Sequence, residues 1–295
     1  MNAPELPAPD HPESMPTDSD MDVFGITDIG KERKVNQDQF LIGALHKHLR
    51  VYSTSLPDVS DLVKSERLAY LAMVADGVGG HAAGQQASKA ALEAVARYVQ
   101  KSMQAYYSDH AGDSDFLNSL HEAALQCHET VLREGETNPE YRGMATTLTL
   151  AIGVWPRAYV LQVGDSRCYL LHDGKLVQIT RDQTMAQELV DQGVLTSGQA
   201  FDSRWAHVLS SAIGGSSAVP QVTRIDHAWD SVLLICSDGL TKHVPDEQIE
   251  TRLRNMTSAP TACRQLVDDA LEGGGTDNVT VIVGRVRRSP AATAT

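Results

Sequence analysis

The chain has 295 residues, of which 42% are hydrophobic and 21% charged, and its formal net charge is −13. This composition is typical of a soluble globular protein, and the negative charge argues against a nucleic-acid-binding protein or one held electrostatically on anionic lipids. No apolar run reaches the roughly 18 residues of a transmembrane helix. We therefore expect a cytoplasmic protein with neither a nucleic-acid nor a membrane partner.

The two ends of the chain are polar. Residues 1–20 are rich in Pro, Asp, Glu and Ser, and residues 288–295 are similar, so both predict disordered tails. The N-terminal residues lack the basic start and apolar core of a signal peptide. No linker or repeat interrupts residues 21–287, which predicts a single domain.

The cysteines are widely spaced and none forms a C-x-x-C pair, which argues against a zinc or thioredoxin-like site. In a chain of this length they predict buried, reduced thiols and a reducing compartment. They are Cys127, Cys168, Cys236 and Cys263.

The first half of the chain predicts three strands and then two helices. MDVFGITDI and FLIGAL are strand-like, and the continuous apolar run LAYLAMVA predicts a strand buried on both faces. After Gly84, alanines recur at helical spacing, as expected for a helix that packs closely on a sheet. A second helix is predicted from about Asp113 to Arg133.

The second half predicts mostly short strands, in TTLTLAIGV, RAYVLQV, RCYLLHD, KLVQIT, SVLLICS and NVTVIVGRV. Asp173-Gly174 predicts a hairpin turn between two of them. Residues 183–220 are mixed, polar and Gly/Ser-rich and are expected to be helical in part and partly mobile. Helices are predicted near 246–255 and 260–271. Antiparallel strands with paired helices indicate an α+β fold of two packed sheets covered by helices.

Three aspartates stand at the ends of buried strands. Asp76-Gly77 follows LAMVA, Asp238-Gly239 follows VLLICS, and Asp277 precedes the last strand. A carboxylate in such a place is costly unless it is paired or binds a cation. Oxygen ligands suit hard ions such as Mg²⁺ and Mn²⁺.

A structural alternative is open for each aspartate. Asp-Gly is a common turn dipeptide, and Asp173-Gly174 is expected to be only that. The spacing by itself does not decide between a metal site and a set of turns.

A possible phosphate ligand precedes the second predicted strand. GKERKVNQDQF places Arg33 five residues before Asp38, and the planar guanidinium of arginine matches phosphate oxygens. The alternative is an exposed surface arginine among other basic residues.

Taken together and in order, several segments resemble the metal-dependent protein phosphatase family (protein phosphatase type 2C) in its bacterial form. The resemblance runs from about Asp22 to Val286. It rests on GKERKVNQDQF, VADGVGGHAAGQQAS, GMATTLTLAI, VLQVGDSRCYLLHDGKLVQITRDQT, LLICSDGL and GGTDNVTVIV. It implies two packed antiparallel sheets flanked on both sides by antiparallel helix pairs, a four-layer sandwich.

The resemblance also implies roles for the acidic residues. Asp76 would bridge two ions, and the carbonyl oxygen of Gly77 would complete one of them. Asp238 and Asp277 would hold the other ion, and Asp38 would reach the metals through water.

Three further expectations come from the same resemblance. Arg33 would grip the substrate phosphate, and residues 185–215 would form a flap beside the site. Gly164, Asp165 and Ser166 match a family signature and are expected to be structural, with Asp165 bonded to neighbouring backbone.

The implied activity is hydrolysis of phosphoserine and phosphothreonine in proteins by a hydroxide that bridges two Mn²⁺ or Mg²⁺ ions. Phosphorylated proteins, including a Ser/Thr kinase, are the expected partners, and a monomer is the expected state.

The sequence departs from the family pattern at a few positions. Gln37 stands where many members carry Glu, and Val78 where eukaryotic members carry a His thought to act as a general acid. His81 is expected to be structural. Glu140 replaces an Asp that holds a third metal in bacterial members, so a third site is possible. Residues 51–67 are expected to form an exposed loop.

Two other functions are considered. A catalytically silent module that binds phosphoproteins is disfavoured because Asp76, Asp238 and Asp277 are present. An enzyme acting on a small phosphoester, or a partner-switching regulator, would have the same metal site and is not excluded by the sequence.

Overall fold

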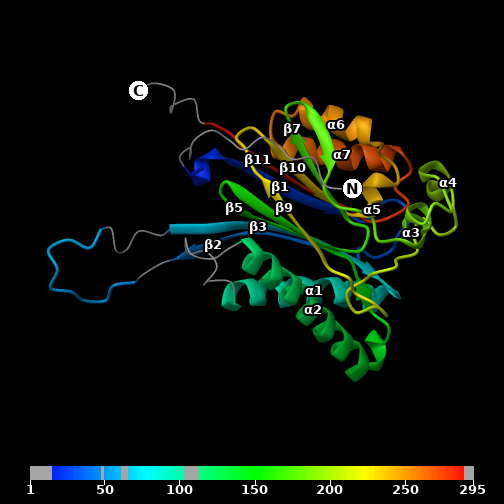
Figure 1. Ribbon diagram of the computed structural model, residues 1–295, viewed down its shortest axis with the longest axis horizontal. Helices are drawn as coiled ribbons and strands as arrows, with labels where there is room; N and C mark the ends of the chain where they lie inside the picture. The colour runs from blue at the N-terminus through cyan, green and yellow to red at the C-terminus, as the bar shows by residue number, and fades with distance from the viewer. Residues whose placement is uncertain (1–14, 48–49, 61–65, 103–112, 289–295) are drawn as a thin grey trace.

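The chain folds into two antiparallel β-sheets stacked face to face, with helices on the outer face of each (Figure 1). This computed structural model describes residues 15–47, 50–60, 66–102 and 113–288. The layers follow the order helix pair, sheet, sheet, helix pair, so the predicted α+β sandwich is confirmed. Within the described residues, no helix is both long and apolar enough to cross a membrane.

The first sheet has the strand order β1-β11-β10-β7-β8 and the second β2-β3-β5-β6-β9, with β4 paired to the end of β3. The strands of the first sheet are β1 (Met21–Asp28), β11 (Val279–Val286), β10 (Val232–Cys236), β7 (Arg167–His172) and β8 (Lys175–Gln178). Those of the second are β2 (Asp38–Lys47), β3 (Glu66–Val78), β5 (Leu148–Val154), β6 (Arg157–Val163), β9 (Gln221–Asp226) and β4 (Ala145–Thr146).

Two long helices cover the second sheet and two shorter ones cover the first. They are α1 (His81–Ser102) and α2 (Asp113–Thr137), then α6 (Asp246–Arg254) and α7 (Ala259–Glu272). The remaining helices are short: η1 (Asp18–Asp20), η3 (Pro139–Tyr141), α3 (Met185–Asp191), α4 (Ser197–Phe201) and α5 (Asp238–Thr241).

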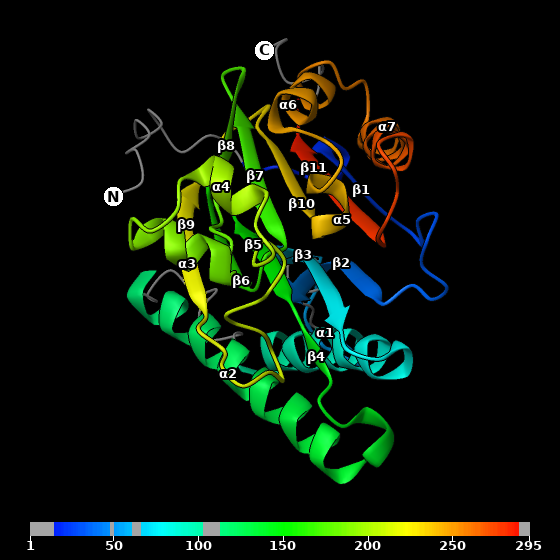
Figure 2. The same ribbon diagram turned by 90° about the vertical axis from the view of Figure 1, so that its right-hand side faces the viewer.

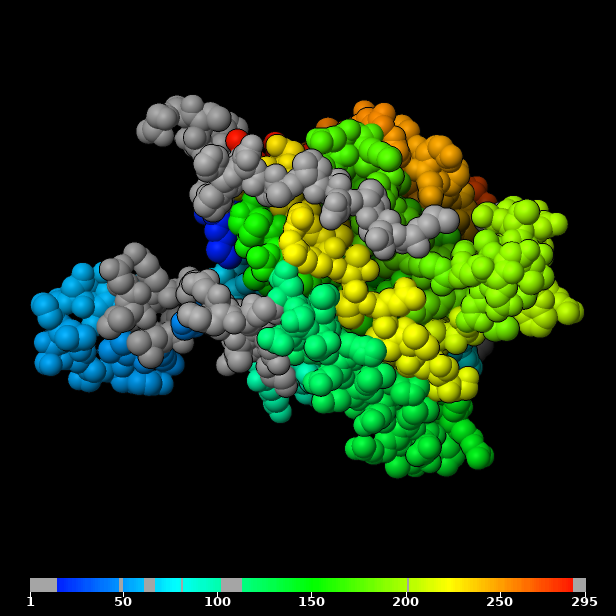
Figure 3. Space-filling model, in the orientation of Figure 1, coloured from blue at the N-terminus to red at the C-terminus, as the bar shows by residue number. Residues whose placement is uncertain are grey.

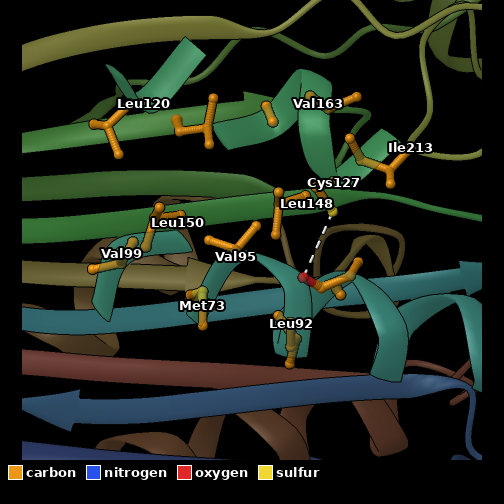
Figure 4. Close-up of a cluster of buried hydrophobic side chains, with 14 of the residues drawn as sticks. Met73, Leu92, Val95, Val99, Leu120, Cys127, Leu148, Leu150, Val163 and Ile213 are labelled. Carbon is orange, nitrogen blue, oxygen red and sulfur yellow. Dashed lines mark hydrogen bonds between the residues drawn. The ribbon is translucent and has the colours of Figure 1, made fainter. Parts of the chain in front are cut away.

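The apolar stripe of α1 explains its place against the sheet. Ala87, Ala91 and Val95 are fully buried in one cluster with Met73 of β3. Small side chains allow the helix to approach the strands closely. Cys127 of α2 is buried in the same cluster. The Cys127 thiol donates a hydrogen bond to the carbonyl oxygen of Ala91 at 3.6 Å (Figure 4).

Most elements lie where the sequence predicts them. The Asp173-Gly174 hairpin is confirmed, with φ values of 50° and 72° at the two positions. β9 and α5 are not among the predicted elements. The partly helical structure expected in 183–220 is present as α3 and α4. All four cysteines are buried and free, as predicted.

The predicted N-terminal tail needs a correction at its inner end. Pro16 is buried and Asp18–Asp20 form a 3-10 turn. Arg67 of β3 holds this turn, because its Nη1 bonds Asp18 Oδ1 at 2.5 Å and its Nη2 donates to the Pro16 carbonyl. The rest of that tail (1–14) and residues 289–295 lie outside the described residues.

The expected loop at 51–67 is exposed along 52–58, but Glu66 and Arg67 already belong to β3. Residues 61–65 lie outside the described residues. The segment 50–60 extends away from the sandwich at the end opposite α3 and α4 (Figure 1).

Candidate functional site

Two aspartates face one another at one edge of the second sheet. Asp38 opens β2 and Asp76 lies near the end of β3, and the antiparallel register makes them direct partners. Asp38 is 1% exposed, and its Oδ2 accepts hydrogen bonds from the hydroxyls of Ser237 and Thr280, both at 2.7 Å. Its Oδ1 is buried with no hydrogen-bond partner among the described residues.

The electrostatics of this pair are unfavourable for two free carboxylates. Burial, with added repulsion from Asp238 and Asp277, raises the pKa of Asp38 to about 6. Burial and then the neighbouring charge of Asp38 raise the pKa of Asp76 well above its usual range. A bound cation would remove this cost by pairing with the ionised forms.

Gly77 lies where the end of β3 meets the start of α1. Its N–H donates to the Gln37 carbonyl at 3.2 Å, and a Cβ at this position would overlap the carbonyl oxygen of Gly84. Glycine therefore lets the strand end approach α1 closely.

Asp238 is supplied by the first sheet, directly after β10 and at the start of α5. Its side chain is 14% exposed, and Oδ1 is buried with no hydrogen-bond partner among the described residues. Gly239 is needed next to it, because a Cβ there would overlap the carbonyl oxygen of Asn278. This close packing fixes α5 against the start of β11.

Asp277 lies two residues before β11. Two cationic side chains contact its carboxylate. Arg33 reaches both carboxylate oxygens, Nε to Oδ1 and Nη2 to Oδ2, each at 2.8 Å, and Lys242 Nζ lies 2.7 Å from Oδ2. Burial alone would raise the pKa of Asp277, but the hydrogen bonds from Arg33 and Lys242 hold it below its usual range.

Arg33 is accessible from solvent. Its side chain is 51% exposed, and it lines an open cavity of ≈ 540 Å³. The cavity is lined by Glu32, Arg33, His207, Lys242, Thr276 and Asp277. A phosphate group entering the cavity would therefore meet the guanidinium directly.

A hydrogen-bond chain fixes the backbone of Asp76. The Asp76 N–H donates to Thr147 Oγ1 at 3.0 Å, and Thr147 Oγ1 lies 2.7 Å from Ser166 Oγ. Gly164 has a φ of 107° and lies against Thr147, where a Cβ would overlap the Thr147 side chain. In this arrangement Gly164 and Ser166 support Thr147, which in turn bonds the Asp76 backbone.

The structural role expected for Asp165 stays a prediction. Its carboxyl bonds its own backbone, but it is also buried, and burial followed by repulsion from Asp238 and Asp182 raises its pKa well above the usual range. Asp165 therefore interacts electrostatically with Asp238, which belongs to the acidic cluster of Asp38, Asp76, Asp238 and Asp277.

Two residues beside the acidic cluster were not singled out from the sequence. Lys242 Nζ lies 2.6 Å from Asp238 Oδ2, and His207 of the segment 185–215 has its Nδ1 3.8 Å from the same oxygen. The Asp238-to-Lys242 spacing of four residues is the helical ion-pair spacing, so a sequence signal for Lys242 exists. His207 has no such signal, because only the tertiary fold brings it near Asp238. In Figure 3, α3 and α4 of the expected flap (185–215) lie in the projecting yellow-green lobe.

The structure describes three of the positions at which the sequence departs from the family pattern: Gln37, Val78 and Glu140. The Gln37 side-chain amide donates to the Gly79 carbonyl at 3.4 Å, and Val78 is 42% exposed. Glu140 is exposed in η3 and does not line the cavity of Arg33 and Asp277, so a third metal stays a prediction. The side chain of His81 lies outside what the structure describes.

The donor set fits hard divalent ions. The buried Oδ1 atoms of Asp38 and Asp238 lack hydrogen-bond partners among the residues that the structure describes, and every candidate ligand is an oxygen, as Mg²⁺ and Mn²⁺ prefer. Among the described residues, no three His, Cys, Asp or Glu side chains are arranged closely enough to hold one metal ion. The Lys242 ammonium lies between the carboxylates of Asp238 and Asp277.

A sequence model described as protein phosphatase 2C matches residues 50–273. The chain belongs to this family. The match confirms the resemblance, and it includes Asp76 and Asp238 while starting after Asp38 and ending before Asp277.

The chain is also similar to characterised members of the family. The serine/threonine protein phosphatase PstP of Mycobacterium tuberculosis is 38% identical over 218 residues, which are 74% of this chain and 40% of that protein. The chain thus matches less than half the length of this relative.

Solved structures agree over nearly the whole fold. A crystal structure of the Mycobacterium tuberculosis phosphatase PstP/Ppp is 30% identical, with a TM-score of 0.73 over 91% of this chain and 99% of that chain. A structure of the PstP catalytic domain in complex with two manganese ions is 31% identical, with a TM-score of 0.70 over the same shares.

Proposed function

We propose that this chain is a metal-dependent phosphatase that removes phosphate from serine and threonine side chains of proteins. The observation that carries the proposal is the gathering of Asp38, Asp76, Asp238 and Asp277 at one edge of the sandwich, next to Arg33. Two of these carboxylates have a buried Oδ1 that finds no hydrogen-bond partner in the described part of the chain. Such a cluster of carboxylates destabilises the folded protein when no cation is bound. With bound divalent ions it can support phosphate hydrolysis.

Two Mn²⁺ or Mg²⁺ ions would be held by oxygen atoms of these residues. Asp76 and the Gly77 carbonyl would bind on the side of the second sheet, and Asp238 and Asp277 on the side of the first. Asp38 would act through water, fixed in place by Ser237 and Thr280. When bound, the ions supply an activated water as nucleophile and neutralise charge on the phosphate.

The chain's own residues orient the substrate. Arg33 would exchange one of its bonds to Asp277 for the phosphate oxygens, which its planar guanidinium matches. The Arg33 side chain is half exposed and lines the open cavity, so a phosphate group can reach the guanidinium from solvent. Thr147 and Ser166 hold the backbone of Asp76 in the same position throughout.

The relatives support the substrate class. PstP is named a serine/threonine protein phosphatase, and a structure of its catalytic domain contains two manganese ions. We extend both properties to this chain and infer that its substrates include a Ser/Thr kinase. The four free, buried cysteines suit a reducing compartment such as the cytoplasm.

The test uses metal-stripped protein with p-nitrophenyl phosphate and a phosphothreonine peptide. Activity should appear on adding Mn²⁺ or Mg²⁺, and Asp238→Asn should reduce it at least about 100-fold, as expected for loss of a metal ligand. Asp173→Asn is the matched control, since Asp173 lies in the β7–β8 turn. A loss of less than about tenfold in Asp238→Asn would contradict the metal assignment.

A silent phosphoprotein-binding module is the second candidate. It predicts that Mn²⁺ up to millimolar concentration produces no heat of binding in calorimetry. The retained carboxylates argue against this function.

A further inference from the structure

Lys242 lies between two of the proposed metal ligands. It follows α5, one helical turn after Asp238, and its Nζ lies 2.6 Å from Asp238 Oδ2 and 2.7 Å from Asp277 Oδ2. The side chain is 17% exposed, so the ammonium is largely removed from water. Figure 2 shows α5 at the end of β10, beside β11.

The ammonium is held as a cation by these contacts. Its Nζ contacts one carboxylate oxygen of Asp238 and one of Asp277, so both ion pairs hold the ammonium in place. A partly buried positive charge between two carboxylates is the arrangement that a bound metal ion would also satisfy. Lys242 and a metal on this side of the centre therefore require the same oxygen atoms.

We propose that Lys242 is a tethered counter-cation that competes with the metal for Asp238 and Asp277 and so sets the affinity of that half of the centre. This inference rests on the proposed function. Metal binding requires the ammonium to withdraw, and the free energy of its two ion pairs is subtracted from the metal affinity. In return, the ammonium offsets the repulsion between the carboxylates of Asp238 and Asp277 in the metal-free protein.

The structure provides a place for the withdrawn side chain. Lys242 lines a second cavity, of ≈ 210 Å³, which lies between α5 and residues 184–207. Asp165 and Asp182 line the same cavity, so a displaced ammonium would still meet carboxylates. The four-carbon stem of lysine is flexible enough for this movement without a change in the backbone.

The test is calorimetric titration of metal-stripped full-length protein with Mn²⁺. Lys242→Met should bind the ion at this half of the centre about 10- to 100-fold more tightly than the wild type, because no ammonium must be displaced. Lys242→Arg keeps the charge and should stay within about threefold of the wild type. Lys175→Met, at the β7–β8 turn, removes one exposed charge elsewhere and should also stay within about threefold.

Thermal unfolding gives a second measurement on the same proteins. Metal-free Lys242→Met should melt below the wild type, and the rise in Tm on adding Mn²⁺ should be larger in the variant. Equal or weaker Mn²⁺ binding by Lys242→Met would overturn the proposal.

A third measurement needs no variant at position 242. Reductive methylation of lysines in the wild type should label Lys242 several-fold faster when Mg²⁺ is bound, because the ammonium has left its ion pairs. Lys175 provides the internal reference. Labelling of Lys242 that is unchanged or slower with Mg²⁺ would overturn the proposal even if Lys242→Met failed to fold.

The two proposals fail in different ways. If wild type and Lys242→Met bind Mn²⁺ equally and both hydrolyse p-nitrophenyl phosphate, the role of Lys242 is wrong and the proposed function stands. If neither protein binds Mn²⁺ nor hydrolyses the substrate, both proposals are overturned.

Discussion

Asp38 and Asp76 are direct partners across the antiparallel pair of β2 and β3, so two carboxylates face one another at a largely buried strand end. Like charges in this position destabilise a sheet. In the metal-free state this repulsion lowers the free energy of unfolding, and the loss can be measured.

Asp38→Asn should stabilise the metal-free protein. At pH 7 the ionised Asp38 is disfavoured, because burial raises its pKa to about 6, above the ordinary 3.8. An amide oxygen can still accept the bonds from Ser237 and Thr280, so the variant should gain ~1–3 kcal/mol in the free energy of unfolding. Urea unfolding in the presence of EDTA would measure this gain.

The sign of its pH dependence follows from the raised pKa. As the pH falls through 6 towards 4, the wild-type carboxyl takes up a proton in the folded state and regains stability, so the difference should disappear. The same substitution should weaken Mn²⁺ binding. A variant that is less stable than the wild type at pH 7 would contradict the electrostatic explanation.

Arg33→Ala should raise KM for a phosphothreonine peptide by about 10- to 100-fold, because a charge-assisted bidentate contact to phosphate is lost. Arg33→Lys should recover only part of this loss, since an ammonium lacks the planar pair of donors. Arg97→Ala is the matched control, because Arg97 is similarly exposed and ion-paired but lies on α1. Steady-state kinetics at saturating Mn²⁺ would distinguish them, and an unchanged KM would exclude phosphate binding by Arg33.

Thr147→Val should destabilise the fold by ~1–2 kcal/mol, because it leaves the buried Asp76 N–H and the Ser166 hydroxyl without a partner. It should also weaken Mn²⁺ binding, since the backbone of Asp76 is no longer fixed. Thr251→Val removes an exposed hydroxyl that bonds within α6 and should change stability by less than about 0.5 kcal/mol. Denaturant unfolding of both variants tests the comparison. Equal effects would mean that the chain through Thr147 has no special role.

His227 should make the protein sensitive to acid. Burial lowers its pKa to about 4, so the folded state holds the neutral ring, while the unfolded state takes up a proton near pH 6.5. The stability it contributes is complete above pH 6.5 and is lost as the pH falls towards 4. His227→Leu should therefore lose ~1–3 kcal/mol less than the wild type between pH 7 and pH 4, measured by urea unfolding. Parallel losses in both proteins would show that His227 is not responsible.

Several features could be predicted from the sequence because their causes are local. The alanine spacing after Gly84 predicts α1, the Asp173-Gly174 pair predicts the hairpin, and the continuous apolar runs predict the central strands. β9 was missed because QVTRID is short, half polar and next to a segment without clear periodicity. The ordered turn at Asp18–Asp20 was missed because it depends on Arg67, about 50 residues away.

The family, the α+β layers and the aspartates next to buried strands can all be predicted from residue order and short-range periodicity. How these aspartates meet depends on the packing of the two sheets. The register of β2 with β3 sets Asp38 opposite Asp76, and the packing of α5 on β11 brings Lys242 between Asp238 and Asp277. These relationships join residues that are 35 to 199 positions apart, as with Asp277 and Lys242 or Asp38 and Ser237. A local sequence pattern cannot predict contacts between residues so far apart in the chain, because these contacts form only when the strands and sheets pack together.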